Sequence, residues 1–203
     1  MKHFIFSVFL ILVILSGCKQ KLESKPEKAI LSYIIGEVML DGQPGTLNQE
    51  IKSETTIETG DQSRAEIRIG TGSGIQVRQN SNVKLIKDQD QWKTEVTEGA
   101  VLNLFRPGSR YQLRGPAGVI AIRGTIFYVH CYNDSTQYVC TCNGTVGIDS
   151  EGMELQEVSA SHHKPYTIIS SDENAHLEAA EMKEHNDVEI FDFMYRIERE
   201  REQ

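Results

Sequence analysis

Residues 115–129 read GPAGVIAIRGTIFYV, and this stretch decides the fold. Two short apolar runs, residues 119–122 and 126–129, are separated by a bend around Gly124. Apolar runs of this length, bounded by glycine and proline, are typical of strands. Gly124 permits a backbone conformation, or a close approach, that a side chain would prevent. We therefore expect two strands joined at Gly124, with Arg123 either donating hydrogen bonds to backbone carbonyls at the bend or serving as a recognition residue.

The same pattern extends over residues 30–148, where short β-like runs are punctuated by turn signals such as Pro107-Gly108. In residues 65–69 charged and apolar side chains alternate, so we expect one face of this strand to be buried and the other to be exposed to solvent. A loose repeat of glycine followed by a β-rich stretch allows short strands to stack turn upon turn. We predict an all-β domain over residues 30–170, built as a solenoid-like stack of short strands, with a β-sandwich as the alternative.

Together these runs resemble the FecR domain of bacterial envelope proteins. The blocks that carry the resemblance are residues 58–69, 72–77, 80–85, 98–101, 115–129 and 143–146. The block at 115–129 is the most specific and is similar to the family's TP-x-G … V-R-G-T-x-F-x-V segment. The resemblance covers residues 32–149. It implies a FecR-like β fold and a sensing or regulatory role in the envelope rather than catalysis.

The resemblance does not extend to the whole mechanism of the family. Its founding members relay a signal from an outer-membrane iron-siderophore transporter to a sigma factor. They carry a cytoplasmic region and a membrane-spanning helix ahead of the FecR domain, and this sequence shows neither. We expect the lipidated chain to lie wholly outside the cytoplasm, so contact with a sigma factor is not carried over.

The N-terminus predicts a lipoprotein signal peptide over residues 1–17. An apolar run at residues 4–15, too short to cross a bilayer, leads into a Leu-Ser-Gly-Cys lipobox that ends at Cys18. Cys18 is expected to become the lipidated N-terminus, followed by a polar tether, so that residues 18–29 form the anchor segment. Lys19 stands where an aspartate commonly retains lipoproteins in the inner membrane, which favours the outer membrane.

Composition narrows the possible partners. The chain has 203 residues and a formal net charge of −8. An acidic chain with no basic stripe has no electrostatic reason to bind nucleic acid. No later segment approaches the roughly 18 apolar residues of a membrane span, so the N-terminal lipid is the expected membrane attachment. The expected partner is another envelope protein or a glycan.

A cysteine and histidine constellation lies late in the β region. Cys140 and Cys142 share a face if they lie on one strand, and Cys131 joins them if it lies opposite or diagonal to Cys140 in a hairpin. The adjacent His162 and His163 would come from the next β run. Three interpretations stay open: a disulfide from Cys131, a Zn or Cu site, and a redox or haem-linked sensor that uses the odd thiol. No other cofactor is expected.

Residues 171–203 predict an acidic helical tail. A first helix, capped near residue 171, is expected to end near His185. Asn186 can cap a second helix, with Glu189 as its capping-box partner. The second helix carries one apolar stripe, at Ile190, Phe193, Met194 and Ile197. We expect this stripe to dock on the β domain, with a partner-binding helix as the alternative.

The sequence carries none of the common catalytic motifs. It shows no nucleophile elbow, no paired carboxylates, no H-E-x-x-H and no phosphate loop. We therefore expect a non-enzymatic binding or sensing module that acts in envelope signalling or regulation. Two alternatives stay open: a metal- or redox-responsive sensor that uses the Cys/His cluster, and a passive structural lipoprotein of the envelope.

Overall fold

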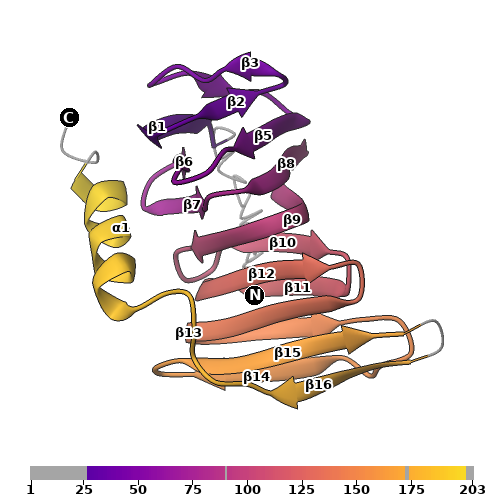
Figure 1. Cartoon of the computed structure of the whole chain (residues 1–203). Helices are drawn as coiled ribbons and strands as arrows, with labels where there is room; N and C mark the ends of the chain where they lie inside the picture. The colour runs from indigo at the N-terminus through magenta and orange to yellow at the C-terminus, as the bar shows by residue number, and fades with distance from the viewer. Residues whose placement is uncertain (1–26, 90, 172–173, 200–203) are drawn as a thin grey trace, which may run out of the picture.

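The computed structural model describes residues 27–89, 91–171 and 174–199, which form strands and one C-terminal helix (Figure 1). The predicted signal peptide and Cys18 lie outside these residues. The elements are β1 Ala29–Ile35, β2 Val38–Leu40, β3 Gln43–Pro44, β4 Glu50–Ile51, β5 Thr55–Thr59, β6 Arg64–Ile69, β7 Ser73–Val77, β8 Ser81–Asp88, β9 Gln91–Leu104, β10 Arg110–Gly115, β11 Gly118–Arg123, β12 Ile126–Asn133, β13 Thr136–Asp149, β14 Gln156–Ala160, β15 Lys164–Ser170, β16 Ala175–Ala179 and α1 Asp187–Arg199. The prediction of an all-β domain with a C-terminal helical extension is confirmed.

The strands stack as two facing layers. Sheet A has the order β4-β1-β6-β7-β9-β12-β13-β15-β16, and sheet B the order β3-β2-β5-β8-β9-β10-β11-β13-β14. The long strands β9 and β13 belong to both sheets and join them into one continuous sheet. Among the described strands every pairing is antiparallel except that of β9 with β10. The predicted stack of short strands is therefore present, but it is built as a sandwich rather than as a regular parallel solenoid.

Two glycines, Gly99 of the loose repeat and Gly124, mark corners at which the chain changes sheets. In β9, Glu98 pairs with β8 of sheet B, whereas Gly99 already pairs with β12 of sheet A. Gly99 has a φ of +84°, a conformation that side chains disfavour. Gly124 lies at the corner between β11 and β12 with a φ of +79°. A Cβ on Gly124 would lie 2.3 Å from the Cα of Pro107, so both the backbone conformation and the close approach expected there are confirmed.

Two separate apolar clusters follow from strand alternation. The larger fills the space between the sheets and takes residues from both, among them Ile67, Val101 and Leu113. The smaller lies on the outer face of sheet A, beneath α1. Because α1 covers that face, residues 99–104 of β9 are buried on both sides instead of alternating. The outer cluster is therefore the place where β9, β12 and β13 meet the helix.

The C-terminal region differs in part from its prediction. The expected first helix is wrong: within residues 171–185 the chain forms β16, which extends sheet A beside β15. The open edge of β15 offers backbone hydrogen bonds to this segment, which outweigh its intrinsic helical propensity. The second helix is confirmed, and its buried residues are Ile190, Phe193 and Ile197, with Met194 partly buried.

The boundary of the β domain also shifts slightly. Strand β1 begins at Ala29, one residue before the expected start, and β16 falls inside the expected helical tail. Within the described ranges, the helix lacks the length and apolar character that a bilayer crossing requires.

Candidate metal centre

The cysteines divide between the two faces of sheet A. Cys140 lies opposite Tyr128, and both side chains belong to the outer cluster beneath α1. Cys142, two residues further along β13, faces the same way. Cys131 is an odd number of positions from Tyr128, so it faces the inner cluster instead. The expectation that all three thiols share a face is therefore wrong for Cys131, and a disulfide from Cys131 to either partner does not fit this register.

His163 reaches the outer pair of thiols, whereas His162 does not. His163 sits in the turn before β15 with a φ of +28°, and its side chain is 5% exposed. Its Nδ1 lies 3.6 Å from the Sγ of Cys140. The His162 side chain is 70% exposed and its Nε2 lies 3.1 Å from Asp187. The two adjacent histidines thus take different places, one inside the cluster and one at its rim.

His185 completes the cluster from the segment between β16 and α1. Its side chain is buried, and its Nε2 lies 3.4 Å from the Sγ of Cys142. The preceding residue, Glu184, has a φ of +67°, a left-handed conformation that is uncommon for glutamate. The carboxylate of Glu184 is held by His130 and by the hydroxyls of Tyr128 and Tyr132. This anchoring aims His185 into the cluster.

His185 is the member of the cluster that the sequence interpretation left out of its metal-ligand candidates. It lies 43 residues from Cys142 in the chain, and no spacing motif links them. The expectation of a helix ending near His185 pointed away from this role, because it placed the residue in a regular element. A weak signal existed in its position directly before the capping residue Asn186, since that position ties it to the start of α1.

The four side chains form what we call the Cys₂His₂ centre: Cys140, Cys142, His163 and His185. Their ligand atoms all lie within 4.8 Å of one another. A tetrahedral Zn²⁺ site with Zn–S of about 2.3 Å and Zn–N of about 2.05 Å has S···N edges of about 3.6 Å. The two S···N distances here, 3.6 and 3.4 Å, match that edge. The centre therefore has the donor set of a closed tetrahedral site, and two of its S···N edges have the expected length.

Each imidazole is oriented by a hydrogen-bond acceptor at the ring nitrogen that faces away from the thiols. The Nε2 of His163 lies 2.8 Å from the Oδ1 of Asp187, and the Nδ1 of His185 lies 2.9 Å from the backbone oxygen of Lys183. Metal-ligating histidines almost always donate their other N–H to a carboxylate or a carbonyl. This arrangement points the lone-pair nitrogen of each ring at a thiol, as metal binding requires.

In the metal-free centre, the neighbouring groups favour a thiolate at Cys140 and a protonated thiol at Cys142. The hydrogen bond from Cys142, helped by those from His185 and His163, lowers the pKa of Cys140 well below that of a free thiol despite burial. The same contact, together with burial, raises the pKa of Cys142. Burial disfavours a charge on His163, but Asp187 and Cys140 outweigh it and raise the pKa of His163. Metal binding would then release the Cys142 proton.

Cys140, His163 and Asp187 also stand in the order of a thiol–imidazole–carboxylate triad. A nucleophilic thiol must reach a substrate, yet Cys140 is 0% exposed and lies beneath α1. Cys142 and His185 further enclose it. The arrangement therefore suits a buried metal ligand better than a nucleophile. Cys131 fits neither role, because burial raises the pKa of its thiol to about 12.

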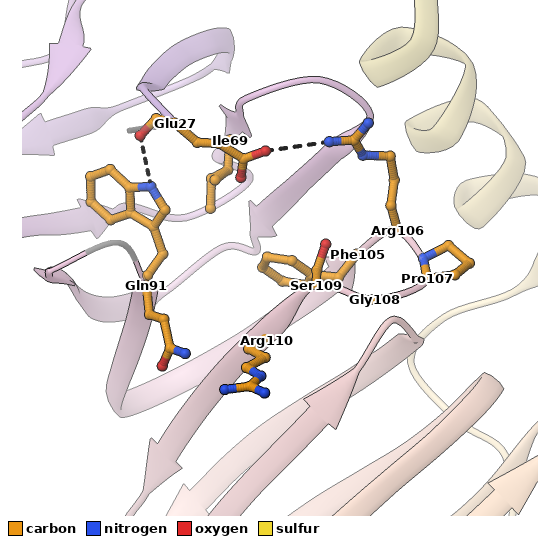
Figure 2. Close-up of a pocket in the computed structure, with 10 residues that line it drawn as sticks. Glu27, Ile69, Gln91, Phe105, Arg106, Pro107, Gly108, Ser109 and Arg110 are labelled. Carbon is orange, nitrogen blue, oxygen red and sulfur yellow. Dashed lines mark hydrogen bonds and ion pairs between the residues drawn. The ribbon is translucent and has the colours of Figure 1, made fainter. Parts of the chain in front are cut away.

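A cavity lies elsewhere in the described part of the molecule. A cavity of about 710 Å³ is lined by Trp92, Phe105, Arg106 and Arg110, among others (Figure 2). Glu27 contacts two sides of the cavity. Its backbone oxygen accepts a hydrogen bond from the Trp92 indole at 3.1 Å, and its carboxylate pairs with Arg106 at 3.3 Å. Its lining contains no thiol or imidazole. This cavity is therefore separate from the Cys₂His₂ centre.

Arg123, the recognition candidate, is exposed at the end of β11 opposite Arg110 of β10. Within the described part of the chain its guanidinium makes no hydrogen bond, so the expected bonds to carbonyls at the bend are not formed. The bend is instead closed by backbone contacts around Gly124, including Phe105 N to Thr125 O at 3.0 Å. A role in recognition stays a prediction.

Comparison with known proteins finds a family match within the β strands. Residues 55–147 match the family model described as FecR protein, and all the blocks that carry the resemblance fall within this range. No curated protein matches the chain. Cys140 and Cys142 lie within the matched residues, whereas His163 and His185 lie beyond them. The Cys₂His₂ centre thus combines the matched domain with the segments that follow it.

Solved structures show the same fold. Two crystal structures of a "putative anti-sigma factor" from Parabacteroides distasonis ATCC 8503, at 1.65 and 2.50 Å resolution, align with TM-scores of 0.51 and 13% sequence identity. The alignment covers 61% of this chain and 59% of theirs. The chain therefore spans about three-fifths of the proteins it matches, and the similarity is one of fold.

Proposed function

We propose that this chain, whose residues 55–147 match the FecR family, is a non-enzymatic regulatory module of the cell envelope that binds one Zn²⁺ ion at the Cys₂His₂ centre. The observation that carries the proposal is the fixing of both imidazoles. Each ring is held by an acceptor on its outer nitrogen, and each presents its other nitrogen to a thiol at the spacing of a tetrahedral edge.

The net charge of the complex favours Zn²⁺ over Cu⁺ at this centre. Two thiolates and two neutral imidazoles make a neutral complex with Zn²⁺, whereas the same ligands leave one negative charge with Cu⁺. The centre is buried beneath α1, and an uncompensated buried charge is costly. Tetrahedral S₂N₂ coordination is also a typical zinc geometry.

The regulatory and envelope parts of the proposal rest on the FecR match and on the N-terminal sequence. The proteins that share this fold include one named as a "putative anti-sigma factor", which supports a role in signalling. The lipobox at Cys18 supports attachment to a membrane, with the outer membrane favoured by Lys19. In this proposal zinc is the input, and the partner is another envelope protein or a glycan.

Zinc content tests the function directly. The full-length chain, purified in detergent and dialysed against trace Zn²⁺, is expected to carry about one zinc per chain by mass spectrometry. Cys142→Ser replaces a thiolate ligand with a poor one, so it is expected to raise the Kd for Zn²⁺ at least about 100-fold. The affinity is measured by competition with a chromophoric chelator.

Two matched variants separate the centre from its surroundings. Cys131→Ser removes a buried thiol from the opposite face of sheet A, and His162→Ala removes the exposed neighbour of His163. Both are expected to keep the zinc, whereas His163→Ala is expected to lose it. Zinc retained by Cys142→Ser, or lost only in Cys131→Ser, would refute the assignment.

The lipid anchor has its own test. In cells fed labelled palmitate, the chain is expected to take up label and to enter the detergent phase on phase separation. Cys18→Ser removes the thiol that receives the diacylglycerol, so both signals are expected to fall to background. Labelling that persists in Cys18→Ser would show that the lipid is elsewhere or that the lipobox is not used.

A further inference from the structure

Helix α1 is held by contacts that are separate from the core of the β sandwich. Its three buried residues pack only in the outer cluster, whereas the sheets close on the inner cluster. Figure 1 shows the helix lying alongside the strand stack, joined to it by the segment after β16. The helix can therefore leave sheet A without opening the space between the sheets.

The start of α1 is part of the Cys₂His₂ centre. His185 directly precedes Asn186, whose Oδ1 caps the helix by accepting from the backbone N of Glu189 at 3.1 Å. The next residue, Asp187, holds the Nε2 of His163. A metal ion in the centre would thus bond strand β13 directly to the residue that leads into the helix.

The other attachments of the helix lie further along it. Glu189 pairs with Arg78 at 3.0 Å, and Arg196 pairs with the buried Glu66. A helix of 13 residues is marginal by itself in water, so docking on sheet A is what keeps α1 folded. Any ligand that binds only the docked state must shift this equilibrium toward docking.

We infer that Zn²⁺ occupancy of the Cys₂His₂ centre controls the docking of residues 180–199 on sheet A, an inference that rests on the function proposed above. Three of the four ligands belong to β13 and the turn before β15, and only His185 moves with the helix. Loss of zinc removes the bond between these two parts. Undocking then uncovers an apolar patch made of Ala100, Leu102, Leu104, Tyr128 and Tyr138.

Thermodynamic linkage between zinc binding and helix docking makes the inference quantitative. If zinc favours the docked state by a given factor, then undocking the helix by mutation must weaken zinc binding by the same factor. Phe193→Ala removes the largest of the buried side chains of α1 without touching a ligand. It is expected to lower zinc affinity at least about 10-fold. Val188→Ala, which changes a residue 75% exposed on the same helix, is the matched control and is expected to leave the affinity unchanged.

Hydrogen exchange on the full-length chain, with mass-spectrometric readout, tests the inference. Saturating Zn²⁺ is expected to slow exchange of the amides of residues 187–199 by about 10- to 1,000-fold relative to chelator, while β5 and β8 of sheet B, which are distant from the helix, change little. His185→Gln is expected to abolish this difference. Trypsin cleavage after Lys183 gives a second readout and is expected to be faster without zinc.

The outcomes separate the two levels of the proposal. If zinc binds with the expected stoichiometry but exchange of residues 187–199 is unchanged, the control of docking is wrong and the zinc function stands. If Phe193→Ala undocks the helix yet binds zinc as tightly as the parent, the linkage is likewise refuted. If no zinc binds, the proposed function and this inference both fall.

Discussion

Replacing Gly124 with alanine is expected to lower the free energy of unfolding by about 3–5 kcal/mol, because the new methyl group meets backbone rather than a movable side chain. A Cβ at this position would lie 2.3 Å from the Cα of Pro107 and 2.6 Å from the carbonyl oxygen of Arg106. The φ of +79° adds strain for any residue with a side chain. Urea denaturation followed by circular dichroism measures the effect.

Gly108 supplies the control for this experiment. Its φ of +87° is similar, but a Cβ there would meet no atom within 4 Å. Gly108→Ala therefore carries the backbone strain alone and is expected to cost about 1 kcal/mol. Equal losses in the two variants would mean that the close approach of the corner to Pro107 does not matter.

Replacing Arg196 with alanine is expected to cost about 3 kcal/mol of helix docking, because it leaves a buried carboxylate without its main counter-charge. Glu66 is 0% exposed and accepts two hydrogen bonds from Arg196, at 2.8 and 2.6 Å. After the change, the side chains among the described residues that still face the carboxylate are Gln76, at 2.8 Å, and Arg64, at 3.7 Å. The loss should appear as faster hydrogen exchange in α1 before the β sandwich unfolds.

Arg199→Ala is the matched control, since Arg199 is exposed and lies over the Tyr195 ring at 6.0 Å. We expect a change within about 0.5 kcal/mol. If Arg196→Ala unfolds the whole chain in one step with the sheets, then α1 and the sandwich are one cooperative unit. That result would contradict the separation of the two apolar clusters.

Several features of the site were accessible to sequence reasoning because they depend on local geometry. Alternation along a strand placed Cys140 and Cys142 on one face, and the capping pattern placed the start of α1 at Asn186. The capping box itself is only half formed. The Glu189 backbone donates to Asn186 as expected, but its carboxylate pairs with Arg78 instead of returning to the cap.

Other features depended on which strands meet and could not be foreseen. The side of the sheet that Cys131 faces is set by the register of β12 against β13, and a shift of one residue reverses it. The partner of Cys142 comes from a segment 43 residues away that lacks regular structure. The strand β16 formed in place of a helix because β15 presented an open edge.

The sequence by itself determined the all-β class, the corner at Gly124, the apolar stripe of α1 and the resemblance to FecR. Each of these is a matter of periodicity, backbone freedom or motif within one stretch of chain. Only the tertiary structure decided that Cys140, Cys142, His163 and His185 meet, and that Cys131 does not join them. The physical reason is that a metal-ligating cluster is defined by distances of a few ångströms between side chains. Those distances are set by strand register and by the docking of α1, to which residues distant in the chain contribute.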